Sequence, residues 1–175
     1  MDNALITSAI SGNRGALEHL LNKFRNNAFS IALKFVKERA EAEDVVQEAF
    51  IKVFLNIEKF RNEASFSTWL YRIVYIESIR ILRKNNQLHT LYSSIDPLIE
   101  VQQHTQEDTE IFVKEKIEVA MKALSAREFL VVNLFYLSEK TINDIALVTN
   151  ESTSNIKVML HRARKKMSNH LSKVL

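Results

Sequence analysis

Apolar residues recur every three or four positions along most of this chain, a spacing that places them on one face of an α-helix. Three such stripes in the first half predict three helices, the last continuing to about Lys84, and a short helix is expected before Gly12. Burial of these stripes against one another predicts an N-terminal domain of residues 1–84. The stripes consist of Leu17, Leu20, Leu21, Phe24, Ala28, Ile31 and Phe35; of Val46, Ala49, Phe50, Val53, Phe54 and Ile57; and of Phe66, Trp69, Leu70, Ile73 and Val74.

Residues 85–110 interrupt this pattern. They contain five acidic residues, no lysine or arginine, and the only proline, Pro97. We interpret them as a flexible polar linker, whose root-mean-square span as a coil would be ~30 Å. Helical spacing resumes at Val113, Ile117, Ala120, Met121 and Leu124. The sequence therefore predicts an all-α fold of two small helical domains, with residues 111–175 forming the second.

The second domain contains signals for three further helices. Ser125 and Glu128 have the spacing of a capping box, which predicts the start of a helix. That helix carries Leu130, Val131, Leu134 and Phe135. A short amphipathic segment at residues 141–148 is then followed by a polar break at residues 149–151 and by a second helical pattern from Ser152 onward. Two helices joined by so short a turn predict a C-terminal helix-turn-helix.

The turn itself has suitable residues. Asn150 stands where the chain needs a residue that tolerates positive φ, and asparagine is the best choice after glycine. Ser152 is a candidate N-cap for the second helix. The residues of that helix expected to face inward are Ile156, Met159, Leu160, Ala163 and Met167.

The second helix of this motif is cationic on its outer side, and no acidic residue follows Glu151. Such a helix suits the DNA major groove, where the opening turns of a recognition helix contact base edges. The alternative is an ordinary solvated basic helix. The candidate DNA-binding residues are Ser152, Ser154, Asn155, Lys157, His161, Arg162, Arg164 and Lys165.

Residues 42–54 combine the second apolar stripe with acidic residues near a helix start, where the helix macrodipole favours them. Two interpretations remain open for the polar side of this helix: ordinary capping and solvation, or a docking face for another protein. The candidate docking residues are Glu43, Asp44, Gln47 and Glu48.

Residues 66–84 mix aromatic side chains with four cations, a combination that suits single-stranded DNA because bases stack and phosphates pair with cations. The cations are Arg72, Arg80, Arg83 and Lys84. Trp69 lies on the apolar stripe, so we expect it in the core rather than as a stacking platform. The preceding loop, residues 58–65, is polar apart from Phe60 and Ala64 and is free to present groups to a ligand.

Composition narrows the choice of function. Two glycines and one proline are too few for many tight turns, which favours long helices, and the absence of cysteine excludes disulfides and thiolate metal sites. HExxH, GxSxG and glycine-rich phosphate-loop motifs are missing, which disfavours an enzyme. No signal peptide and no window of ~20 apolar residues is present. We therefore expect a soluble, cytoplasmic protein without metal or other cofactor.

Three segments together resemble a bacterial RNA polymerase sigma factor of the extracytoplasmic-function (ECF) type. Residues 42–54 resemble the core-polymerase-binding helix of that family, and residues 66–84 resemble the segment that grips and opens the minus-ten promoter element. Residues 124–128 (LSARE), 136–137, 145–146 and 157–164 (KVMLHRAR) resemble the domain that reads the minus-thirty-five element. The similarity covers nearly the whole chain.

The resemblance implies a role for each candidate group. The four docking residues would contact the clamp helices of the largest polymerase subunit, with the flap of the second-largest subunit as a further contact. Residues 58–65 would pocket an extruded promoter base, with Phe60, Arg61 and Asn62 among its DNA contacts. The four cations of residues 66–84 would hold the opened strand and the flanking duplex. The eight candidates of the last helix would face the minus-thirty-five element.

The resemblance also implies partners: core RNA polymerase, promoter DNA and an anti-sigma factor, with no small-molecule substrate and a monomeric free chain. The sequence departs from the family at Ile76, where asparagine is common, and at Met159, where arginine is frequent. Asn150 and Glu151 replace the usual glycine and apolar residue of the turn.

Two other binding functions remain as alternatives. A helix-turn-helix repressor or activator would dimerise and bind a palindromic site without polymerase. A helical adaptor that binds only proteins would be indifferent to DNA at low salt.

Overall fold

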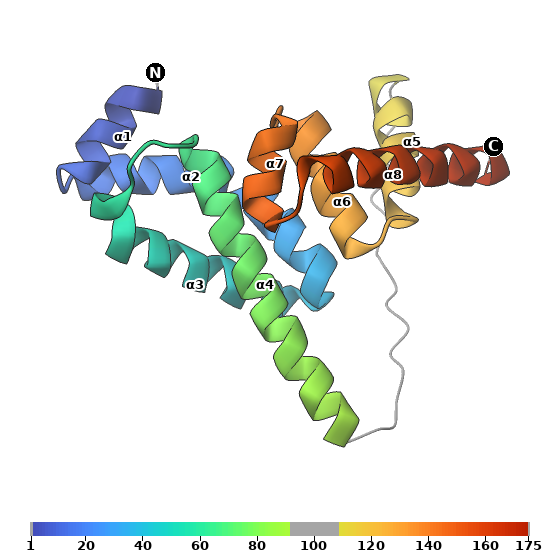
Figure 1. Cartoon of the computed structure of the whole chain (residues 1–175), viewed down its shortest axis with the longest axis horizontal. Helices are drawn as coiled ribbons and strands as arrows, with labels where there is room; N and C mark the ends of the chain where they lie inside the picture. Colours follow the sequence, from blue (N-terminus) through green and yellow to red (C-terminus); the bar gives the residue numbers. More distant parts are fainter. Residues whose placement is uncertain (1, 92–108, 175) are drawn as a thin grey trace.

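The computed structural model describes residues 2–91 and 109–174, and every regular element in those two stretches is helical (Figure 1). The first stretch comprises α1 (Asp2–Ile10), α2 (Arg14–Val36), α3 (Arg39–Asn56), the 3-10 turn η1 (Ile57–Lys59) and α4 (Phe66–Leu91). The second comprises α5 (Thr109–Lys122), α6 (Ala126–Val132), the π-helical turn η2 (Asn133–Leu137), α7 (Ile142–Thr149) and α8 (Thr153–Val174). The predicted all-α class of two helical domains is confirmed.

In the N-terminal domain, α2, α3 and α4 pack on one another and α1 lies on α2. The fully buried side chains include Leu20, Ile31, Val45, Val53, Leu70 and Val74. One stripe prediction is wrong: Phe54 is 48% exposed. The buried arc of α3 runs through Ala42, Val45, Ala49 and Val53. Phe54 lies about 100° further round the helix, beyond the surface that α2 and α4 cover.

The helix ends follow local capping rules. The Asn13 side chain accepts a hydrogen bond from the backbone N–H of Ala16 at 3.1 Å and so caps α2. At its other end, α4 continues past Lys84 to Leu91, later than expected. Asn85 donates to both carboxylate oxygens of Glu41 at 2.8 and 3.0 Å, which ties this extension to α3. The predicted linker character of residues 92–108 lies outside the described residues.

The C-terminal domain surrounds a small core formed by α6, α7 and α8. The predicted capping box is present: Ser125 caps α6, while the Glu128 carboxylate accepts from the backbone N–H of Ser125 at 2.9 Å. Its fully buried side chains include Leu130, Val131, Leu134, Ile145, Val148 and Ile156. Ile117, expected in this core, is exposed on α5 instead.

The two domains pack against each other, an arrangement that residue patterns did not predict. The first part of α4 lies along α7, and α2 lies against α6 (Figure 1). Asn27 of α2 donates to the Ser138 hydroxyl at 2.8 Å, and the Lys34 ammonium donates to the carbonyl of Met121 at 3.2 Å. The same ammonium lies 5.4 Å from the centre of the Phe129 ring. The helix-turn-helix and the first part of α4, both predicted to bind DNA, are therefore neighbours.

Candidate DNA and polymerase interfaces

The helix-turn-helix is built as its sequence predicts. Thr141 and Asp144 form a capping box at the start of α7, with the Thr141 hydroxyl 2.6 Å from the Asp144 carboxylate. Asn150 ends α7 in the left-handed conformation, at φ 58°, and its N–H donates to the carbonyl of Ala146. The Ser152 hydroxyl accepts from the backbone N–H of Asn155 at 3.2 Å, which fixes the start of α8.

The outer face of α8 is open. Ile156, Leu160 and Ala163 are buried against the rest of the domain, whereas Met159 and Met167 are half-buried. The eight candidate DNA-binding residues, Ser152 through Lys165, are all exposed. Those within the helix occupy the half-turn opposite the buried stripe, as a 100° step per residue requires. The structure thus brings these residues together on one surface.

A local acid orients one of these side chains. The Asn155 amide nitrogen donates to the Glu151 carboxylate at 2.8 Å, and Glu151 also lies 3.7 Å from the Arg127 guanidinium. Arg164 donates from Nε to the carbonyl of Leu160 at 3.3 Å. The departure from the family at Glu151 therefore adds a polar anchor beside the opening turn of α8.

The four predicted docking residues also share one helix face. Glu43, Asp44 and Gln47 are exposed on α3 and Glu48 is half-buried. Two of them already pair within the chain: Glu43 lies 3.1 Å from Arg39, and Glu48 lies 3.7 Å from Lys52. Both cations belong to α3 and are themselves partly or fully exposed, so these pairs leave the carboxylates accessible.

Sequence patterns missed the apolar part of this face. Ile51, Phe54 and Leu55 are 45%, 48% and 68% exposed and fall on the same arc of α3 as the docking residues. The Arg14 guanidinium lies 5.7 Å from the centre of the Phe54 ring. A groove between α2 and α3, lined partly by Phe29, Phe50 and Phe54, adjoins them. The signal was present in the sequence: α3 carries more apolar residues than one buried arc can hold.

The loop before α4 borders a cavity of about 360 Å³. Arg61 and Asn62 are exposed at its rim, and Asn62 has a positive φ of 57°. Phe60 is buried, with its ring centre 5.2 Å from that of Trp69 and 6.0 Å from that of Phe66. Phe60 therefore forms the wall of the cavity, not a free side chain. Trp69 is half-buried and belongs to both the core and the cavity lining.

The other domain closes one side of this cavity. Leu147 of α7 is among the lining residues, and its carbonyl accepts a hydrogen bond from Arg72 at 2.5 Å. The Lys140 ammonium donates to the hydroxyls of Ser67 at 2.6 Å and Ser65 at 3.0 Å. One of the four predicted strand-binding cations, Arg72, is thus engaged in the domain contact, whereas Arg80, Arg83 and Lys84 are exposed further along α4.

Burial at this contact shifts the pKa of three groups. Burial lowers the pKa of Lys34 and also that of Lys140, where the nearby Asp144 charge partly opposes it. Burial raises the pKa of Tyr71, against hydrogen bonds with Asn27 and Ser138. Each shift requires that water be excluded from part of the group's surroundings.

Within residues 2–91 and 109–174 no three His, Asp or Glu side chains are grouped so that they could hold a metal ion. None of the described helices is long and apolar enough to cross a lipid bilayer.

Two family models match the chain: sigma-70 region 2 over residues 20–87 and sigma-70 region 4 over residues 114–167. The RNA polymerase sigma factor SigV of Bacillus subtilis is 28% identical over 149 residues, which cover 85% of this chain and 87% of that protein. The ECF RNA polymerase sigma factor SigW of the same organism is 25% identical over 170 residues, or 91% of each chain. The ECF sigma-E factor of Haemophilus influenzae is 40% identical over 72 residues, which cover 41% of this chain and 38% of that protein.

Solved structures share the fold. The structure of CnrH in complex with the cytosolic domain of CnrY matches with a TM-score of 0.67 and 20% identity, covering 98% of this chain and 97% of that one. The sigma factor RpoE of Bartonella quintana, in complex with the anti-sigma factor NepR, matches with a TM-score of 0.68 and 23% identity, covering 90% and 96%.

The two matched regions account for most of the chain, occur in the order of the two domains, and include the α3 face, the α4 cations and the helix-turn-helix. Members of this family are transcription initiation factors and not enzymes, in agreement with the missing catalytic motifs. The chain belongs to the ECF-type RNA polymerase sigma factors, with sigma-70 regions 2 and 4, and directs promoter-specific initiation of transcription.

Proposed function

We propose that α8 reads the minus-thirty-five element of the promoter. The observation that carries this proposal is the open outer half of α8, where seven of the eight candidate residues lie, with Ser152 just before it, and no acidic side chain occurs within the helix. Ser154, Asn155 and Lys157 belong to the opening turns, which contact base edges in helix-turn-helix proteins. Arg162, Arg164 and Lys165 follow at positions suited to phosphates.

In the same proposal, region 2 binds the minus-ten element. An extruded base enters the cavity beside Arg61, Asn62 and Trp69, and the opened strand follows the exposed cations of α4. The cavity lining includes Thr68, Trp69 and Arg72 of α4, and the exposed cations begin about two turns later on the same helix, which supports a single path for the strand. Leu147 borders the cavity, so entry of a base requires α7 to move.

The α3 face is the docking surface for core polymerase in this proposal. Its mixture of acidic and apolar side chains fits a protein partner better than DNA, because acidic groups repel phosphates. The clamp helices of the largest subunit would occupy this face, and the flap of the second-largest subunit would contact region 4. The protein would act in the cytoplasm, because core polymerase and promoter DNA are found there. The free chain would be a monomer.

An anti-sigma factor is the second proposed protein partner. Support comes from a structural relative, which is described as a sigma factor in complex with an anti-sigma factor.

The energy for strand opening would come from binding the exposed strand and the polymerase.

The docking assignment is tested by charge reversal. Asp44→Lys combined with Glu48→Lys should reduce retention of the chain on immobilised core polymerase by roughly tenfold or more, since two favourable contacts become repulsive. Glu118→Lys is the matched control, because Glu118 is an exposed acid on α5. Equal retention of the double variant and the control would refute the α3 assignment.

Footprinting tests the two-element assignment. The holoenzyme should protect both promoter elements, whereas the chain alone should bind duplex DNA weakly. A stable dimer that protects a palindromic site in the absence of polymerase would favour an ordinary helix-turn-helix regulator instead.

A further inference from the structure

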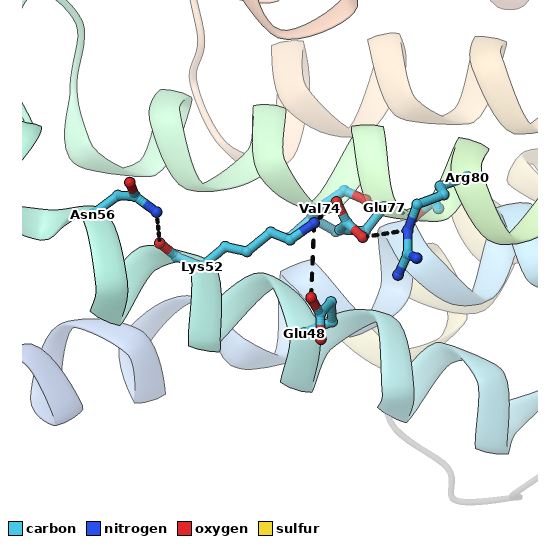
Figure 2. A network of polar contacts seen from close by, with 7 residues as sticks. Glu48, Lys52, Asn56, Val74, Glu77 and Arg80 are labelled. Carbon is cyan, nitrogen blue, oxygen red and sulfur yellow. Dashed lines mark hydrogen bonds and ion pairs between the residues drawn. The ribbon is translucent and has the colours of Figure 1, made fainter.

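A carboxylate is buried between α3 and α4. The Glu77 side chain is only 3% exposed and lies between Val74 and Ser78 on the inner face of α4, both fully buried. Its Oε1 is 2.5 Å from the Lys52 ammonium of α3, and its Oε2 is 2.8 Å from Nε of Arg80. Lys52 also approaches Glu48 at 3.7 Å (Figure 2). The acid therefore joins the docking helix to a cation of the strand-binding helix.

The fold does not require an acid at this position. A buried ionised carboxylate is costly unless it is paired, and replacing buried ion pairs with apolar residues of similar size is often neutral or stabilising. A methionine or leucine would fill the space between the two helices without needing partners. Something other than packing must account for a carboxylate whose two oxygens each hold a different cation.

The bond with Glu77 holds the Arg80 side chain in one position. That side chain is 62% exposed, so it can meet a ligand in solvent. The bond to Glu77 uses Nε, one of the five N–H groups of a guanidinium, and the four on the two outer nitrogens can still donate. A free arginine side chain loses rotamer entropy when it binds, and one already held in place loses less.

We propose that Glu77 is a positioning residue for strand binding: it holds the guanidinium of Arg80 toward the phosphates of the opened promoter strand, and Lys52 balances its charge. The inference rests on the proposed role of Arg80 in region 2. Glu77 touches neither DNA nor polymerase; it acts through Arg80.

A double-mutant cycle in the holoenzyme tests this proposal. The four proteins are the natural chain, Glu77→Met, Arg80→Ala and the combination, and the readout is affinity for a forked promoter fragment with a single-stranded minus-ten element. Glu77→Met should weaken binding roughly twofold to tenfold, the range expected for freeing one arginine side chain. Glu77→Gln, which keeps an acceptor oxygen, should lose less affinity for the forked fragment than Glu77→Met. In the Arg80→Ala background, Glu77→Met should have no further effect.

Two other measurements separate positioning from structural damage. The melting temperature of Glu77→Met should match or exceed that of the natural chain, and its binding to core polymerase should be unchanged. Glu118→Gln, on exposed α5, is the matched loss of an acid and should leave fork binding unchanged. Should Glu77→Met prove too unstable to purify, the same cycle with Glu77→Gln decides.

Three results would overturn the proposal. They differ in whether they also refute the proposed role of Arg80 in region 2. If Glu77→Met lowers the affinity for the fork equally in the natural and the Arg80→Ala backgrounds, the role of Glu77 is purely structural. Full fork binding by Glu77→Met, beside weak binding by Arg80→Ala, would defeat the inference and leave the function of region 2 intact. Full binding by Arg80→Ala would defeat both the role of Arg80 and the inference built on it.

Discussion

The two proposed DNA faces of this protein differ in how accessible they are. The outer half of α8 is exposed from Ser154 to Lys165, with its polar and cationic side chains turned to solvent. The cavity beside Trp69, by contrast, has Leu147 of the other domain in its wall, and Arg72 is bonded to the backbone of α7. In the packed arrangement, one face is ready to meet duplex DNA and the other is partly covered.

This difference has a physical origin. Helix α7 meets α4 through the backbone carbonyl of Leu147 and through Asp144 of its capping box, so polar groups form much of the contact. Thr68 of α4 lies 3.4 Å from the Asp144 carboxylate of that capping box. A promoter holds its two elements more than one helical turn apart, and one turn already spans ~34 Å. Under the proposed function, in which each domain reads one element, the domain contact would oppose unassisted DNA binding.

The largest expected effect tests the open face. Replacing Lys157 and Arg162 together with alanine should weaken holoenzyme binding to a promoter with a minus-thirty-five element by roughly tenfold or more and reduce the salt slope by about two. Lys122→Ala, at an exposed position of α5, is the control for loss of one positive charge away from α8 and should change the salt slope by no more than about one. Unchanged affinity and salt slope in the double variant would show that α8 is not the recognition helix.

The covered face is tested at Lys140, which joins the two domains through Ser65 and Ser67. Lys140→Ala removes two hydrogen bonds, which together contribute about 1 kcal/mol once the cost of burying the ammonium is included. The free chain should then bind a single-stranded minus-ten oligonucleotide roughly fivefold more tightly, with no change toward minus-thirty-five duplex. Trp69 is the only tryptophan and lines the cavity, so acrylamide quenching of its fluorescence should rise. Identical quenching in both proteins would mean that the contact does not cover the cavity.

The stability of the C-terminal domain should depend on pH through the Glu128 carboxylate. Burial pushes the pKa of Glu128 up, but bonds from Lys166 and Ser125 outweigh it, so the pKa lies below the usual 4.5. On acidification the Glu128 carboxylate is protonated in the unfolded chain at a higher pH than in the folded chain. Its contribution to the free energy of unfolding is therefore present above pH 4.5 and is lost as pH falls through the lowered pKa. Glu128→Gln should cost ~0.5–1 kcal/mol at neutral pH and flatten the acid slope. Hydrogen exchange of α6 amides measures this; an unchanged acid slope would contradict the assignment.

The smallest effect is expected from Asn150→Gly, in the turn between α7 and α8. Asn150→Gly should raise the stability of the C-terminal domain by only a few tenths of a kcal/mol, because asparagine already tolerates positive φ, whereas Asn150→Val should lower it by ~1–2 kcal/mol. Amide exchange in α7 and α8 reports both changes. Equal stability of the two variants would show that φ at this position does not matter.

Local signals predicted the local structure well. The Ser125–Glu128 capping box, the left-handed Asn150 and the N-cap at Ser152 all follow from rules that involve only a few neighbouring residues. The buried side of α8 was predictable for the same reason, since a single helical period decides which residues face inward.

Longer-range features were not predictable in this way. Phe54 has the spacing of a core residue, and only the arrangement of α2 and α4 around α3 leaves it outside. The bond between Arg72 and the carbonyl of Leu147 joins residues far apart in sequence and has no pattern of its own. Glu77 reads as an ordinary polar residue of α4 until Lys52 is placed beside it. The roles of the individual DNA- and polymerase-binding residues stay predictions.

Run-off transcription with purified core polymerase and genomic promoter fragments tests the central claim most directly. We expect discrete start sites that require this chain, are lost when the α8 face is neutralised, and are lost when the α3 charges are reversed. Start sites that persist in both variants, or no initiation at any fragment despite tight holoenzyme assembly, would contradict this claim.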